Sequence, residues 1–144
     1  MPVSLERFLK AQEPVYAEVL RELRAGEKRG HWMWFIFPQL AGLGVSSTSQ
    51  FFGIESLDEA IAYSKHLTLG TRLVECTTLV NEAKGRTLID IFGSVDAMKF
   101  RSSMTLFSIA APDGPFMSAL EKYCDGRLDQ RSLDILDRRA TGDG

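Results

Sequence analysis

The chain has 144 residues, which is the length of one domain that can bury a hydrophobic core. Hydrophobic residues make up 44% of it and charged residues 25%, as in an ordinary soluble globular protein. The 17 basic and 19 acidic side chains leave a formal charge of −2, which argues against a general electrostatic nucleic-acid binder.

The location of the protein is inferred from what the sequence lacks. The first residues show neither the charged region nor the apolar region of a signal peptide. The longest apolar run, Trp32 to Phe37, is too short to cross a bilayer. Cys76 and Cys124 lie too far apart for a CxxC or metal motif, so we expect free thiols in a reducing compartment. These features predict a cytoplasmic protein without contact to membranes.

Short helices around one aromatic segment are expected in the first half of the chain. Ser4 is positioned to cap a first helix, and a second is expected over Pro14–Ala25, ended by Gly26. The run Trp32 to Phe37 would be apolar on both faces of a strand, and no second strong strand is available to pair with it. We therefore expect a helix or an irregular buried segment there.

Capped helices are expected to continue through the second half. Ser56 and Glu59 predict a capping box that opens a helix ending near His66. Thr87 predicts the cap of a brief helix, and Ser94 the cap of the following one. The longer helices are expected over Gly70–Lys84, Val95–Ala110 and Phe116–Cys124, and a last helix is expected to start near Asp129. In the helix over Val95–Ala110, the side chains expected to point inward are Met98, Leu106, Phe107 and Ile109.

These elements predict a mainly α protein, a compact single-domain orthogonal bundle of many helices. The helical domain is expected over residues 1–137. The remaining segment, 138–144, is polar and contains glycine, so we expect a disordered tail.

The first candidate site lies at the start of the aromatic segment. Lys28, Arg29 and His31 precede or adjoin Trp32 and Trp34. Basic side chains bind phosphates and carboxylates, and aromatic faces stack on bases or sugars. The pattern therefore suits a nucleotide-like ligand. The alternative is that the cations form a solvated loop end while the aromatic rings are only core.

The second candidate site is a polar segment of the helix expected over Val95–Ala110. Lys99, Ser102 and Ser103 lie three and four positions apart and would share one face, with Arg101 nearby. A purely buried helix does not need so many polar groups. The alternative is that the hydroxyl groups bond back to the helix or form a polar outer face.

Two residues are candidates for proton transfer. His31 suits a general base, although the sequence shows no acid to partner it. Asp90 is flanked by apolar residues, which would bury it partly and raise its pKa. The alternative for Asp90 is that it points outward or caps a neighbouring helix. The sequence contains no GxSxG, HExxH, GxGxxG or P-loop motif, so we expect no metal and no cofactor.

Three segments resemble a known family. They are Arg7-Phe8 with Gln12-Glu13-Pro14-Val15-Tyr16, the run Gly26 to Leu40, and Lys99 with Arg101-Ser102-Ser103-Met104-Thr105-Leu106-Phe107. They look like the bacterial family catalogued as domain of unknown function eighteen-ten, sometimes mislabelled calpastatin, although nothing here resembles that disordered inhibitor. The resemblance covers nearly the whole chain. It implies a compact, mainly helical bacterial protein without an established activity. A more distant similarity to YbiA-like proteins, which process ADP-ribose derivatives, rests on fold-level analogy.

Two functions follow as hypotheses. The leading one is a small-molecule site, in an enzyme or in a binding protein, that binds a phosphorylated nucleoside such as an ADP-ribose derivative. It requires the two polar segments to meet in space. The alternative is a non-catalytic protein-interaction module with exposed aromatic rings. In the leading hypothesis the phosphate is bound by Lys28, Arg29, Lys99 and Arg101. Trp32 or Trp34 stacks on the ligand, and His31 or Asp90 transfers a proton. The remaining polar contacts come from Gln39, Ser102 and Ser103.

Overall fold

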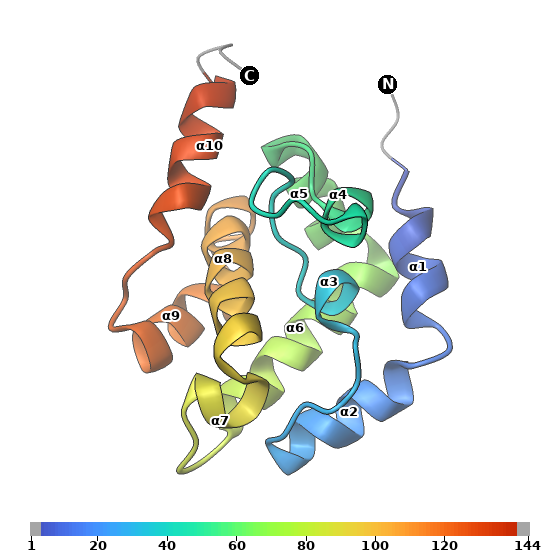
Figure 1. Ribbon diagram of the computed structural model, residues 1–144, viewed down its shortest axis with the longest axis vertical. Coiled ribbons are helices and arrows are strands. Elements are labelled where there is room, and N and C mark those ends of the chain that lie inside the picture. The colour runs from blue at the N-terminus through green and yellow to red at the C-terminus, as the bar shows by residue number, and fades with distance from the viewer. Residues whose placement is uncertain (1–3, 141–144) are drawn as a thin grey trace.

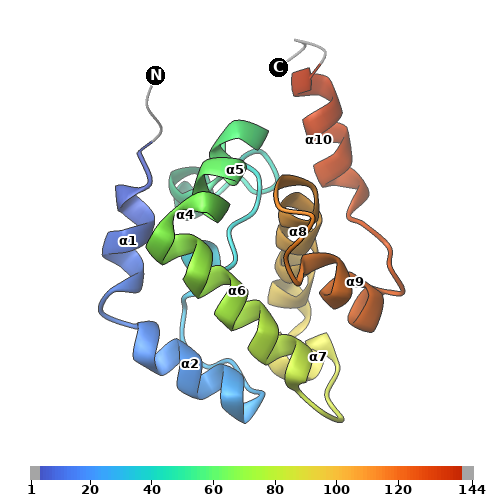
Figure 2. The same cartoon turned by 180° about the vertical axis from the view of Figure 1, so that it is seen from behind.

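Two long helices organise the computed structural model, which describes residues 4–140. Helix α8 (Ser94–Ala110) runs through the middle and contacts α5, α7, α9 and α10 (Figure 1). Helix α6 (Leu67–Glu82) crosses the opposite side and contacts α2, α3, α5 and α9 (Figure 2). The shorter helices are α1 (Glu6–Gln12), α2 (Tyr16–Ala25), α3 (Met33–Ile36), α4 (Ser47–Phe52), α5 (Leu57–Lys65), α7 (Leu88–Phe92), α9 (Phe116–Cys124) and α10 (Gln130–Ala140).

The predicted fold class is confirmed: residues 4–140 form one mainly α domain whose helices cross at steep angles (Figures 1 and 2). Within that range the sole β pairing is an isolated parallel bridge between Leu40 and Ile54. The Ile54 N–H donates to the Gln39 carbonyl at 2.9 Å, which fixes the chain just after the aromatic segment. None of the helices in the described range has the length and apolar character needed to span a membrane.

Helix capping follows the sequence in part. Thr87 and Asp90 form a complete capping box at the start of α7. Ser56 caps α5 as predicted, but the Glu59 carboxylate does not return to the Ser56 backbone. It accepts instead from the Glu55 N–H at 2.7 Å and forms an ion pair with Arg7 at 3.3 Å. A nearby cation has therefore replaced half of the predicted capping box.

Several predicted helix starts are wrong. Helix α6 begins at Leu67 instead of Gly70, because the His66 Nδ1 accepts from the Thr68 and Leu69 N–H groups and caps the helix earlier. Helix α2 begins at Tyr16 instead of Pro14. The residues expected as caps of α1 and α8 do not cap: the N-cap positions belong to Leu5 and Gly93, in place of Ser4 and Ser94.

The buried face of α8 differs from the prediction. Leu106 and Phe107 are buried as expected, but Met98 is 70% exposed and Ile109 is 39% exposed. The middle of the helix, Ser102–Ser108, is buried on every side, whereas neighbouring helices leave one side of each end uncovered. A helical period cannot show which side of such a central helix stays uncovered.

The end of the chain also departs from the prediction. Helix α10 continues through Arg138 and Arg139 to Ala140, so the helical domain extends three residues into the segment predicted as a tail. The rest of that segment, 141–144, lies outside the described residues.

An aromatic cluster joins α3, α7 and α8 in the core. The Phe37 ring contacts Phe100 edge-to-face with 5.0 Å between centroids, and Phe92 stacks on Phe100 at 5.1 Å. Trp32 contacts both Phe37 and Phe92. All four rings are buried, so the segment carrying Trp32 is tied to the amino-terminal half of α8 by packing.

Replacing the central ring tests this cluster. Phe100→Ala is expected to lower the free energy of unfolding by about 3–5 kcal/mol, because it removes a buried ring and leaves a cavity. Urea unfolding followed by circular dichroism measures the effect. The control is Phe51→Ala, because Phe51 is 59% exposed. A loss no larger in Phe100→Ala than in this control would contradict the central position of Phe100.

Candidate functional site

A buried carboxylate shapes the loop between α2 and α3. Gly26 ends α2 in the left-handed conformation, with φ of 72°, and the chain turns back over the helix. The Glu22 Oε1 accepts from the backbone N–H groups of Arg29 at 2.7 Å and Gly30 at 2.9 Å, and from the Trp32 indole at 2.9 Å. A Cβ at Gly30 would lie only 2.9 Å from the Trp32 ring. The loop is therefore held in one conformation by α2.

This loop directs Lys28 toward α8. The Lys28 N–H donates to the Ile91 carbonyl at 2.7 Å, which attaches the loop to α7. The Lys28 Nζ lies 2.9 Å from the Asp96 Oδ2 and donates to the Gly30 carbonyl at 2.5 Å. It also lies 5.1 Å from the centre of the Trp32 ring system. The lysine side chain is 8% exposed, so its position is well defined by its surroundings.

A second lysine reaches the same carboxylate from α8. Asp96 lies in the first turn of α8, where the helix dipole favours a negative charge. The Lys99 Nζ lies 3.1 Å from the Asp96 Oδ1 and 3.8 Å from the Trp34 ring centroid, in a cation–π contact. Asp96 thus joins two lysines from distant parts of the sequence. The prediction that the two polar segments meet in space is confirmed.

Asp96 is ionised between the two lysines. Burial raises the pKa of Asp96, but the hydrogen bonds and positive charges of Lys28 and Lys99 outweigh burial and hold that pKa below its ordinary 3.8. Asp96 is consequently ionised at neutral pH. Among the direct contacts one carboxylate faces two ammonium groups, and the ionised Glu22 carboxylate is also near enough to Lys28 for the two charges to interact.

Two hollows adjoin the cluster. The first hollow, of about 100 Å³, is mostly polar and is lined by Lys28, His31, Met33, Trp34, Asp96 and Lys99. The second hollow, of about 220 Å³, is mostly apolar, and its walls include Gln39, Met98, Ser102 and Arg131. Trp34 and Lys99 line both hollows. In the described part of the chain, no group of three or more His, Cys, Asp or Glu side chains is placed to hold a metal ion.

Comparison with known proteins identifies the family. The model of the family described as "Protein of unknown function (DUF1810)" matches residues 2–136. The chain belongs to this family. A solved structure is similar over nearly its whole length: the conserved hypothetical protein Rv1873 from Mycobacterium tuberculosis is 53% identical, with a TM-score of 0.91. That similarity covers 92% of this chain and 96% of Rv1873. No curated protein matches the chain.

The structure of this DUF1810 member brings six of the predicted site residues to the two hollows. Lys28, His31, Trp34 and Lys99 line the first hollow. Gln39 and Ser102 line the second, together with Trp34 and Lys99. The Ser102 hydroxyl donates to the Met98 carbonyl one turn earlier, as the back-bonding alternative expects.

Four of the predicted ligand-binding residues lie outside the two hollows. Arg29 is exposed and pairs with Glu27 at 3.1 Å. Arg101 donates to the carbonyls of Arg127 and Leu128 and so supports the segment before α10. The other two, Trp32 and Ser103, are buried.

Asp90 follows the outward-pointing alternative, and the expected partial burial with a raised pKa is wrong. The residue is exposed, and its carboxylate accepts from the Thr87 N–H at 2.9 Å within the capping box of α7. The hydrogen bonds from the Thr87 backbone and hydroxyl lower the pKa of Asp90 below its ordinary value. Asp90 lines neither hollow and is not beside His31. Its role in the fold is that of a helix cap.

Sequence reasoning missed several residues of the site. Asp96 is not among the predicted site residues, although it joins the two lysines. Its spacing of three from Lys99 is that of an ion pair on one helix face, and this signal could have identified it. The second hollow also uses Met98 of α8, and it uses Asp129 and Arg131, whose approach depends on how α10 packs.

Glu22 is the residue on which this geometry can be tested. Burial raises its pKa, but hydrogen bonds from the Gly30 and Arg29 backbone and the Trp32 indole, together with the Lys28 charge, bring the pKa below its ordinary 4.5. Because the pKa is lower in the folded state, the ionised carboxylate stabilises the fold above pH 4.5. This contribution is lost as the pH falls through the folded-state pKa.

Glu22→Gln is expected to lower the free energy of unfolding at neutral pH by about 1.5–3 kcal/mol, the range for hydrogen bonds to a charged group. The difference from the unmodified protein should shrink as the pH falls below 4.5. Chemical unfolding at a series of pH values measures both effects. The matched control is Glu18→Gln, which alters an exposed carboxylate of the same helix. A pH-independent loss in Glu22→Gln would contradict the role of the charge.

Proposed function

We propose that this protein binds a small phosphorylated ligand of the nucleoside type, similar to ADP-ribose. The observation that carries the proposal is the convergence of Lys28 and Lys99 on one carboxylate beside Trp34. This arrangement places two ammonium groups, held by one carboxylate, along a hollow that adjoins a second, mostly apolar one. A phosphate with an attached ring matches that pairing of chemistries.

The phosphate is assigned to the first hollow. An ammonium group has three N–H donors, and Lys28 uses two of them on Gly30 and Asp96. Lys99 uses one on Asp96. The remaining donors, with the His31 ring in the same wall, are available to phosphate oxygens. Hydrogen bonds between charged partners are about twice as strong as neutral ones, so this hollow selects for an anion.

The ring part of the ligand is assigned to the second hollow. Trp34 lines both hollows, so a ligand that spans them with its phosphate in the first would place its next group against this residue. Met98 adds apolar surface, and the Gln39 amide and Arg131 guanidinium are polar groups in the same wall. Aromatic rings and guanidinium planes stack on nucleobases, which favours a nucleoside over an aliphatic phosphate.

His31 is the proton-transfer candidate that this proposal retains. It lines the first hollow, where a general base could reach a group attached to the phosphate. Asp90 is withdrawn from that role because it caps α7 and lines neither hollow. Asp96 holds the two lysines together and acts as a positioning residue. The distant likeness to YbiA-like proteins makes ADP-ribose the first probe, on fold-level analogy.

The alternative function, a protein-interaction surface with exposed aromatic rings, has less support. Trp32 is 2% exposed, and its indole is bonded to the buried Glu22. Trp34 is half-buried beneath the Lys99 ammonium. The two tryptophans therefore do not form the exposed apolar patch that such an interface needs.

Isothermal titration with ADP-ribose, AMP and adenosine tests the phosphate site. ADP-ribose and AMP are expected to bind and adenosine to bind more weakly. Lys99→Met, which keeps the aliphatic stem, should weaken ADP-ribose binding about tenfold or more, as loss of a charged hydrogen bond does. The control, Lys84→Met, changes an exposed lysine outside both hollows. Absence of binding by both phosphorylated compounds, or equal affinity in the two variants, would overturn the proposal.

Tryptophan fluorescence tests the place of the ring. ADP-ribose is expected to change the emission of the unmodified protein, because Trp34 lines both hollows. Trp34→Phe should abolish that change, since the remaining Trp32 is buried. The measurement requires only a titration of ligand into each protein. An emission change of equal size in Trp34→Phe would place the ligand elsewhere.

A further inference from the structure

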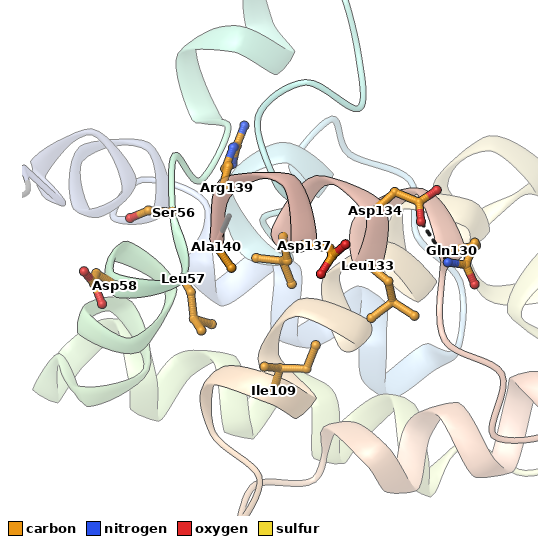
Figure 3. Close-up of a pocket in the computed structure, with 11 residues that line it drawn as sticks. Ser56, Leu57, Asp58, Ile109, Gln130, Leu133, Asp134, Asp137, Arg139 and Ala140 are labelled. Carbon is orange, nitrogen blue, oxygen red and sulfur yellow. Dashed lines mark hydrogen bonds between the residues drawn. The ribbon is translucent and has the colours of Figure 1, made fainter. Parts of the chain in front are cut away.

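A larger cavity lies on another part of the molecule. It has a volume of about 710 Å³ and is bounded by α10, the end of α8 and the start of α5 (Figure 3). None of its lining residues belongs to either hollow of the candidate site. We call this cavity the α10 groove.

Apolar side chains form the interior of the α10 groove. Leu57 from α5, Ile109 from α8 and Leu133 from α10 point into it (Figure 3). Leu136 and Ala140 continue the wall along α10, at spacings of three and four residues that place them on the same helix face as Leu133. A different part of α10, with Ser132 and Ile135, is buried in the protein. The groove-facing side of α10 therefore presents apolar groups to open space.

The edge of the α10 groove is acidic. The Asp137 carboxylate lies over the groove between Leu57 and Leu133, while Asp58 and Asp134 lie toward its two ends (Figure 3). The one cation in the wall, Arg139, points away and donates to the carbonyls of Glu55 at 2.8 Å and Ala41 at 3.0 Å. Three carboxylates thus surround an apolar interior.

We propose that the α10 groove docks a basic amphipathic helix of a partner protein. In helix-in-groove recognition, apolar side chains spaced by three and four residues enter an elongated apolar groove. A cavity of about 710 Å³ accommodates several such side chains. Lysines or arginines flanking the apolar face of the partner would then lie near Asp58, Asp134 and Asp137, where opposite charges determine orientation and partner choice.

The charge of the groove decides against other occupants. A phosphorylated ligand of the kind proposed for the first hollow would meet three carboxylates and be repelled. A second copy of this chain, pairing groove against groove, would bring the two acidic edges together. A cationic partner relieves this repulsion and covers the exposed apolar surface at the same time.

Fluorescence anisotropy with a synthetic peptide tests the proposal on the full chain. The probe is a labelled amphipathic helix made of leucine and lysine, compared with the same peptide carrying glutamate in place of lysine. The lysine peptide is expected to bind about tenfold or more tightly than the glutamate peptide, and added salt should weaken its binding. Equal binding of the two peptides would overturn the acidic edge as the selecting feature.

Variants locate the binding. Leu133→Gln and Asp137→Asn are each expected to weaken the lysine peptide by about threefold to tenfold, as loss of an interface anchor does. Asp137 is exposed, so its variant should fold normally even if Leu133→Gln is less stable. Leu67→Gln and Asp113→Asn, at exposed positions outside the groove, are the matched controls. Unchanged affinity in both groove variants would overturn the proposal. A concentration-dependent dimer, seen by sedimentation and altered by Asp137→Asn, would also overturn the proposal, because the occupant of the groove would then be a second copy of this chain.

Discussion

The carboxylate of Glu22 is the constraint on which the candidate site depends. It accepts from two backbone N–H groups of the loop and from the Trp32 indole, so one buried charge satisfies three donors. Without it those donors would be left unpaired in a water-poor environment, which is costly. Because the loop is held from α2 on one side and from the Ile91 carbonyl on the other, Lys28 has little freedom. The site is therefore an extension of the core.

This rigidity affects what binding requires. The Lys28 and Lys99 side chains are already ordered by Asp96 and by the faces of Trp32 and Trp34. A ligand then loses less affinity to the ordering of long side chains than it would on an open surface. Asp96 has a cost as well, since its negative charge offsets part of the attraction for an anion. The arrangement therefore weakens the attraction for an anion but holds both lysine side chains in a defined geometry.

The sequence allowed the mainly α fold and the meeting of the two lysine segments to be predicted, because both depend on local patterns and on family motifs. It was misleading at Asp90, where a local helix cap decides, and at Met98 and Arg131, where the packing of neighbouring helices decides. Asp90 is flanked by apolar residues, yet on the short helix α7 its carboxylate returns to the Thr87 N–H and stays exposed. Met98 has the spacing of a core residue but lies on the uncovered side of α8. The contribution of Arg131 to the second hollow depends on the packing of α10, which no local pattern specifies.

Helix α10 connects the two parts of the molecule for which binding is proposed. The Asp129 carboxylate caps its start by accepting from Ser132, while the Asp129 N–H donates to the Thr105 hydroxyl of α8 at 2.8 Å. Asp129 also lines the second hollow, whereas the later turns of α10 line the α10 groove. The same helix thus borders the mostly apolar second hollow near its start and an acidic groove along the rest of its length. The two places share no lining residue, and the acidic groove would repel the phosphorylated ligand proposed for the first hollow, so both can be occupied without competition.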